Sequence, residues 1–163
     1  MWKKLKSAFF AEEAKSSSMT VMRQGKTVPA DEVFEAWTSG DLKRMLAAVK
    51  TPTNPIDRHF LLMAIVDQTY KQRKDAKSRS LCIRFAEQHI SEFARIAPAL
   101  KKEHAGTLPR VSTFQKYATL LTEDGDFDRA IEVCKTAIAY DLVDGTKSGF
   151  ESRIDRIRKK AAG

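Results

Sequence analysis

The sequence predicts an all-α fold built from antiparallel helix hairpins, and three observations lead to this prediction. Apolar residues recur at spacings of three and four through much of the chain, which is the period of an amphipathic helix. Glycine and proline are sparse, at 7 and 5 of 163 residues, so long segments can remain helical. Residues that commonly cap helices stand in front of several of these segments.

The composition allows a single packed domain and favours acidic partners. A chain of 163 residues with 42% hydrophobic residues buries roughly 70% of the surface that its unfolded form exposes, so it can form a core without disulfides. Its 29 lysine and arginine residues exceed its 21 acidic residues, which gives a net charge of +8. This excess favours contact with acidic peptide, nucleic acid or anionic lipid, although many proteins with the same balance have no such partner.

Three further features predict a cytoplasmic protein. No run of 18 apolar residues is present in the sequence, so no transmembrane helix is expected. The apolar stretch near the start is too short for a signal peptide, and Glu12 and Glu13 follow it at once. Cys82 and Cys134 each lie within an apolar helical stripe, which is typical of reduced cysteines in a core.

Residues 1–29 are predicted to precede the helical domain, which is expected to span residues 30–163. Within residues 1–14, large apolar side chains fall on one side of a predicted amphipathic helix and lysines on the other. Such a helix could pack on its own domain, on a second copy of the chain or on an anionic membrane. Residues 15–29 lack helical periodicity and are predicted to be a flexible linker, so no sheet is expected.

The first helices of the domain are predicted from their capping residues. Asp31 and Asp41 can each cap a short helix, and together these form a first, short hairpin. Asp57 is the expected N-cap of a longer helix at about 58–72. Because this helix is apolar around most of its circumference, it is expected to lie centrally.

A basic connector and a second long helix are predicted to follow. The segment 71–79 is rich in lysine and arginine, and the stripe after it predicts a helix over 79–96. Two prolines bound the next segment, 97–109, which is expected to be a long loop.

The last third of the chain is predicted to form a hairpin and a final helix. Capping boxes, in which a serine and a residue three positions later each bond a free helix-end N–H group, are expected at 112–115 and 148–151. Gly125 can adopt the positive φ that the turn of the hairpin requires, and a later stop at Asp144 and Gly145 is expected to end its second helix. The final helix, 148–160, is expected to bury three apolar residues: Phe150, Ile154 and Ile157.

Three alanines, Ala118, Ala130 and Ala137, lie in the segment 114–141 on the two sides of a Gly-Asp-Phe turn at 125–127. With these residues the segment resembles a tetratricopeptide repeat, a family whose unit of about 34 residues consists of two antiparallel helices. The alanines stand where the two helices of such a unit cross, and the turn is similar to the Gly-Asp-Tyr turn of the family.

The resemblance implies a short tetratricopeptide-like array with one good repeat at 111–142 and a C-terminal capping helix at 148–160. Residues 58–96 are expected to form a second, degenerate hairpin. Leu142 stands where the repeat normally closes with proline, and no period of 34 residues continues through the rest of the chain.

Catalytic and metal-binding patterns are absent from the sequence. His59, His89 and His104 are far apart in the chain and have no cysteine or carboxylate at ligand spacing on a matching face. No nucleophile elbow, phosphate-binding loop or dinucleotide motif is present. We therefore expect a protein that is not an enzyme and that holds neither a metal nor a cofactor.

The resemblance also implies a binding surface, because the first helix of each hairpin lines the concave side of a tetratricopeptide array. Three polar residues of that helix are expected to contact the partner: Gln115, Thr119 and Thr122. Gln115 and Thr119 replace the lysine and asparagine with which the family grips a C-terminal carboxylate. They therefore favour hydrogen bonds to a peptide backbone.

A second candidate site is the turn before the final helix. Lys147 and Arg153 lie close to a helix N-terminus there and could hold an anion, although a helix stop followed by a capped restart explains the same residues. The leading function is therefore a protein–protein adaptor that binds a peptide or partner helix. The alternative is contact with a nucleic acid or an anionic membrane through the connector 71–79 and the basic C-terminus.

Overall fold

The computed structural model describes residues 19–163, so the helix expected within residues 1–14 lies outside the described part of the chain. About 68% of the described residues are helical, which confirms the all-α prediction. The elements, in chain order, are β1 (Thr20–Arg23), β2 (Lys26–Pro29), α1 (Glu32–Ser39), α2 (Leu42–Ala48), α3 (Pro55–Lys71), α4 (Ala76–Glu103), α5 (Ser112–Glu123), α6 (Phe127–Ala139) and α7 (Gly149–Ala162).

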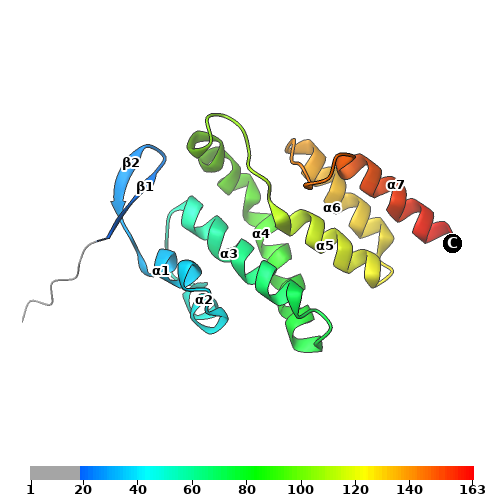
Figure 1. Ribbon diagram of the computed structural model, residues 1–163, viewed down its shortest axis with the longest axis horizontal. Helices are drawn as coiled ribbons and strands as arrows, with labels where there is room; N and C mark the ends of the chain where they lie inside the picture. Colours follow the sequence, from blue (N-terminus) through cyan, green and yellow to red (C-terminus); the bar gives the residue numbers. More distant parts are fainter. Residues whose placement is uncertain (1–18) are drawn as a thin grey trace, which may run out of the picture.

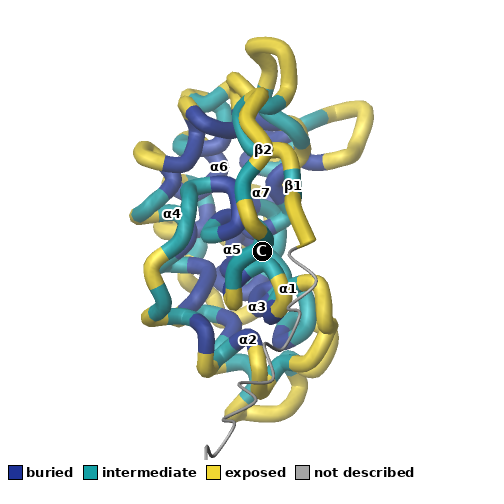
Figure 2. Tube along the Cα trace, turned by 90° about the vertical axis from the view of Figure 1, so that its left-hand side faces the viewer, coloured by how far each residue is buried: buried dark blue, intermediate teal, exposed yellow. Residues whose placement is uncertain are grey.

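The helices form a row of antiparallel hairpins (Figure 1). The pairs α1/α2, α3/α4 and α5/α6 follow one another along the row. The first helices of neighbouring hairpins pack together, α1 against α3 and α3 against α5, and α7 packs against α6. The buried residues, dark blue along the Cα trace in Figure 2, form one hydrophobic core cluster. None of the helices in the described part of the chain combines the length and the hydropathy that a membrane span requires.

Two of the predicted caps are present, and one is wrong. Asp31 accepts a hydrogen bond from the Phe34 amide at 2.8 Å, and Asp41 accepts one from the Lys43 amide at 2.9 Å. The helix predicted to start after Asp57 begins three residues earlier, because Asn54 caps it and Pro55 occupies its first position. Proline is tolerated there because a first-turn N–H needs no helical partner.

Neither predicted capping box is formed. The serine at 112 is the first residue of α5, and its hydroxyl donates to Asp67 of α3 at 2.7 Å instead of capping its own helix. Ser148 makes no side-chain capping bond at the start of α7. In α5, a contact between hairpins has therefore replaced the local one.

The second long helix is longer at both ends than the sequence predicts. The turn after α3 is short, and Asp75 caps α4 by accepting from the Ser78 amide at 2.9 Å. At the other end, α4 continues through Pro98 to Glu103, where a loop was expected from residue 97. Pro98 lies on the exposed face of α4, so the carbonyl that it leaves without a helical donor can bond to water.

The linker prediction for residues 15–29, and with it the expected absence of sheet, is wrong for residues 20–29. These residues form a two-stranded antiparallel hairpin in which Val21 lies opposite Val28. Gln24 and Gly25, both with positive φ, make its two-residue turn. Arg23 anchors the hairpin to α3 through an ion pair with the buried Asp57, at 2.7 Å.

The end of α6 also differs from the prediction. The helix stops at Ala139 rather than at Asp144 and Gly145, because Asp141 adopts a φ of 58°. The Leu142 amide then donates back to the Ala137 carbonyl at 3.0 Å, which is a common way to close a helix. The turn at Gly125 has the predicted positive φ, 78°. Phe150, Ile154 and Ile157 of α7 are buried, as predicted.

Candidate functional site

A groove of about 290 Å³ lies between α5 and α7, and we call it the α5–α7 groove. It contains two of the three predicted partner-binding residues and one residue of the predicted anion site. Its lining residues are Ala118, Thr119, Thr122 and Glu123 of α5 and Arg153, Arg156, Ile157 and Lys160 of α7.

The two threonines present oxygen atoms rather than free protons to the groove. The Thr119 hydroxyl donates to the Gln115 carbonyl at 2.8 Å, and the Thr122 hydroxyl donates to the Ala118 carbonyl at 2.7 Å. Thr119 also accepts a long hydrogen bond, 3.4 Å, from Arg153. A partner would therefore find acceptors at these positions, and the donors of the groove come from α7.

Arg153 is held at the groove by a buried carboxylate. Its guanidinium donates to Asp144 at 3.1 Å, and Thr146 donates to the same carboxylate through its amide and its hydroxyl. Burial alone would raise the pKa of Asp144, but these hydrogen bonds outweigh it and lower the pKa. The negative charge beside Arg153 opposes an added anion at this position.

The cations that remain available in the groove come from α7. Arg156 and Lys160 are exposed and form no ion pair with any described residue. The buried Ile157 and the fully buried Ala118 form an apolar floor beneath them. The place of these two cations could not be predicted, because nothing in the sequence shows that this side of α7 borders α5.

The remaining predicted site residues lie away from the groove lining. Gln115 accepts a hydrogen bond from Arg110 at 3.3 Å. Lys147 is exposed in the loop before α7, where it makes no hydrogen bond or ion pair with another described residue. The anion site at Lys147 and Arg153 stays a prediction.

The predicted basic connector 71–79 is partly neutralised. Arg73 pairs with Glu123 at 3.1 Å, and Arg79 pairs with Glu123 and Asp124 at 3.0 and 2.7 Å. These bonds lower the pKa of Glu123, although its partial burial acts in the opposite direction. The only acidic residue of the groove lining is therefore already engaged by two arginines.

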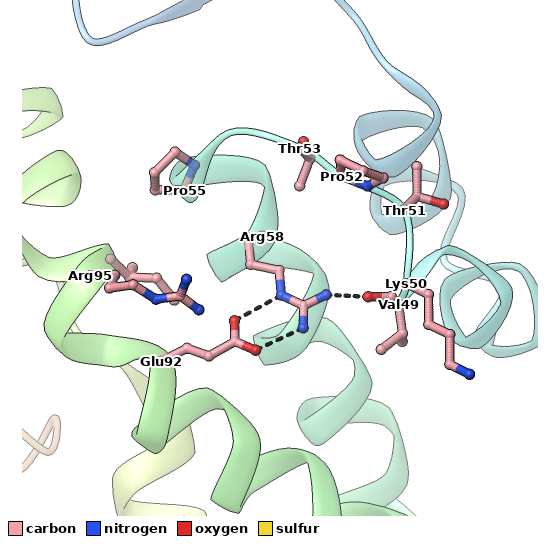
Figure 3. A pocket seen from close by; sticks show the side chains of 10 residues that line it. Val49, Lys50, Thr51, Pro52, Thr53, Pro55, Arg58, Glu92 and Arg95 are labelled. Carbon is pink, nitrogen blue, oxygen red and sulfur yellow. Dashed lines mark hydrogen bonds and ion pairs between the residues drawn. The ribbon is translucent and has the colours of Figure 1, made fainter.

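A second pocket, of about 380 Å³, lies where the α2–α3 loop meets α4 (Figure 3). Arg58 crosses it and makes two hydrogen bonds of 2.8 Å to Glu92, as well as one to the Val49 carbonyl. The bonds from Arg58 lower the pKa of Glu92. Arg58 therefore holds the α2–α3 loop against α4, whereas Arg95, which also lines this pocket, forms no ion pair with a described residue.

Two of the three histidines, which are far apart in the sequence, are neighbours in the core. His59 of α3 and His89 of α4 are both fully buried, and their ring nitrogens are 2.9 Å apart. His89 also contacts the Thr113 hydroxyl of α5 at 2.7 Å, whereas Nε2 of His59 has no hydrogen-bond partner among the described residues. Burial lowers the pKa of His59 to about 4 and holds the pKa of His89 well below its usual value.

The other candidate reactive groups are parts of the core. Cys82 and Cys134 are free and buried, as predicted. Burial raises the pKa of the Cys134 thiol to about 11, which disfavours the reactive thiolate. No group of three or more histidine, cysteine or acidic side chains within residues 19–163 is arranged to hold a metal ion.

The described part of the protein is a row of helix hairpins with a groove beside its last helix. No protein-family model matches the chain, and no solved structure matches it significantly. The chain is similar to an uncharacterized protein of Aquifex aeolicus (strain VF5), with 25% identity over 144 residues. The match covers 86% of this chain and 66% of the relative, just under two thirds of the relative's length.

Proposed function

We propose that the protein is a tetratricopeptide-like interaction module that binds an acidic segment of a partner protein in the α5–α7 groove. The observation that carries this proposal is the composition of the groove. An apolar floor lies beneath two cations that no described carboxylate neutralises. Such a combination suits a peptide that places apolar side chains on the floor and carboxylates beside α7.

The arrangement of the helices supports the same proposal. Ala118, Ala130 and Ala137 are fully buried where α5 and α6 pack together, as the resemblance to the repeat family implies. The first helices of successive hairpins are neighbours, and α7, which packs against α6, borders α5 at the groove. In helical arrays of this kind, the surface formed by such a series carries the binding site.

The spacing of the cations on α7 sets a requirement for the partner. Arg156 and Lys160 are four residues apart, so they lie about 6 Å apart along the helix axis. Carboxylates one turn apart on a partner helix, or on alternate residues of an extended segment, would match this spacing.

A display library of short random-sequence peptides tests the proposal. Peptides selected by the intact protein should be enriched in aspartate and glutamate, and Arg156→Glu should abolish their binding. Arg158→Glu is the matched control, because Arg158 is an exposed arginine of the same helix outside the groove. Selected peptides without acidic enrichment, or equal losses in both variants, would contradict the proposal.

A further inference from the structure

The exposed side of α4 carries positive charge only. Every exposed residue of this helix is a lysine, an arginine or a small neutral residue, namely alanine, serine or proline. The exposed cations are Lys77, Arg84, Arg95, Lys101 and Lys102, which we call the cationic face of α4. Exposed positions recur along the outer side of this helix (Figure 2).

Four of these cations are aligned. At 100° per residue, Lys77, Arg84, Arg95 and Lys102 fall within an arc of about 20° around the helix. At 1.5 Å per residue, the line from the first to the last is roughly 37 Å long. This length is close to one turn of duplex DNA, about 34 Å.

The acidic residues of α4 are engaged with neighbouring elements. Glu87 accepts from Tyr117 of α5 at 2.7 Å, Glu92 accepts from Arg58 of α3 at 2.8 Å, and Glu103 accepts from the Gln24 amide of the β-hairpin. None of the five cations forms an ion pair with a described residue, whereas the half-buried Arg79 at the start of the same helix has two. The helix thus engages its carboxylates with neighbouring elements, whereas its five exposed cations form no ion pair with a described residue.

The side chains on the cationic face of α4 indicate which class of partner it can bind. It has no large exposed apolar residue, since those of the described chain are Met19, Met22 and Val143. It therefore lacks both the apolar centre of a typical protein interface and the anchor with which an amphipathic helix enters a membrane. It also has no exposed aromatic ring on which a single-stranded base could stack.

We propose that the cationic face of α4 binds the phosphate backbone of a double-stranded nucleic acid without sequence preference. Lysine and arginine contacts to phosphates position a protein on a duplex without reading its bases. The serines and alanines between the cations allow the backbone to approach the helix closely. This surface is separate from the α5–α7 groove, so an experiment can contradict the proposal for one of them without contradicting the proposal for the other.

Fluorescence anisotropy with duplexes of about 20 base pairs tests the proposal, since that length covers the line of cations. Affinity should fall with salt, with a log–log slope of roughly −0.9 for each phosphate neutralised, and should not depend on base sequence. The double variant Arg84→Gln, Arg95→Gln should weaken binding and reduce the magnitude of the slope by about 2. The double variant Lys135→Gln, Arg158→Gln removes the same charge from α6 and α7 and should change neither quantity beyond the small effect of net charge.

Several results would overturn the proposal. These are absence of duplex binding by the intact protein, equal effects of the two double variants, and tighter binding of single strands than of duplexes. Co-flotation with anionic vesicles that depends on Arg84 and Arg95, without duplex binding, would assign the face to a membrane instead. Far-ultraviolet circular dichroism checks that both variants are folded.

Discussion

The two long hairpins have different interiors. In α5/α6, helices of 12 and 13 residues meet at small buried residues, among them Ala118 and Ala130. In α3/α4, helices of 17 and 28 residues enclose a pair of histidines and the large ring of Phe93. In the shorter hairpin, small side chains let the two helix backbones approach closely. In the longer hairpin, large and polar side chains fill the space between the helices. A regular spacing of small residues in the sequence indicates the close packing of α5 and α6. The sequence shows no comparable pattern for the packing of large and polar side chains between α3 and α4.

The two hairpins also differ in the surface that each one offers. The first helix of α5/α6 lines the α5–α7 groove with threonines, and the cations of that groove belong to α7. The second helix of α3/α4 carries its own aligned cations on its exposed side. We therefore expect surface substitutions in one hairpin to leave binding of the ligand proposed for the other hairpin unchanged.

The largest expected effect on stability comes from Phe93, which joins the two hairpins. Its ring lies 5.4 Å from that of Phe114 and 4.9 Å from that of Tyr140, and it is fully buried. Phe93→Ala should lower the free energy of unfolding by about 3–5 kcal/mol, measured by urea denaturation. Phe127→Ala, at a half-buried ring, serves as a comparison and should cost less. A cost for Phe93→Ala no larger than that of Phe127→Ala would mean that the hairpins do not share this core.

Acid should destabilise the α3/α4 hairpin through its histidines. In the unfolded chain a histidine takes up a proton near pH 6.5, whereas His59 in the fold stays neutral down to about pH 4. The unfolded state therefore binds more protons in this window, and stability that is fully present above pH 6.5 is lost as the pH falls toward 4.

The expected slope is up to about 1.4 kcal/mol per pH unit for each histidine that is protonated only on unfolding. Urea denaturation at a series of pH values measures it. His59→Leu should flatten the slope, because it removes the buried group whose pKa is lowered in the fold. Stability that does not vary between pH 6.5 and 5 would contradict the buried, neutral pair.

The close crossing of α5 and α6 is tested by enlarging one alanine. Ala130 is fully buried, so Ala130→Leu should force the helices apart and cost ~1–3 kcal/mol in thermal or urea unfolding. Ala139→Leu adds the same volume at an exposed position of the same helix and should change stability by less than about 0.5 kcal/mol. Similar melting temperatures for the two variants would disprove a tight crossing.

The smallest effect is expected in the turn between α5 and α6. Gly125 has a φ of 78°, so a side chain at this position is strained even though no atom blocks it. Gly125→Ala should cost about 1 kcal/mol. Lys74→Ala, in the turn of the other hairpin, should be neutral by the same urea measurement, since that turn has no residue with positive φ. Equal losses in the free energy of unfolding for Gly125→Ala and Lys74→Ala would contradict the expectation that only the turn between α5 and α6 depends on a positive φ.

The helical fold was predictable from the sequence because apolar periodicity is a local property. The positions of Asp31, Asp41 and Gly125 were correct for the same reason, since a cap or a turn depends on neighbours within a few residues. The prediction for Ser112 failed because Asp67, 45 residues away, competes for its hydroxyl. The missed β-hairpin had a local signal, the Gln24-Gly25 turn between two short alternating segments.

The candidate groove could be predicted only in part. Thr119 and Thr122 followed from the resemblance to the repeat family, which concerns one hairpin. Arg156 and Lys160 could not follow from it, because their place beside α5 depends on how α7 packs against α6. The contact between His59 and His89 depends in the same way on the registration of α3 against α4.

The proposed function requires an acidic partner segment to occupy the α5–α7 groove. NMR titration of the intact, isotope-labelled protein with a selected acidic peptide tests it most directly. We expect the amide shifts that change most to lie around Thr119 and Thr122 in α5 and around Arg156 and Lys160 in α7. The amides around Arg84 and Arg95 in α4 should be unaffected. The largest changes along α4, or no saturable change in α5 and α7, would contradict the proposed function.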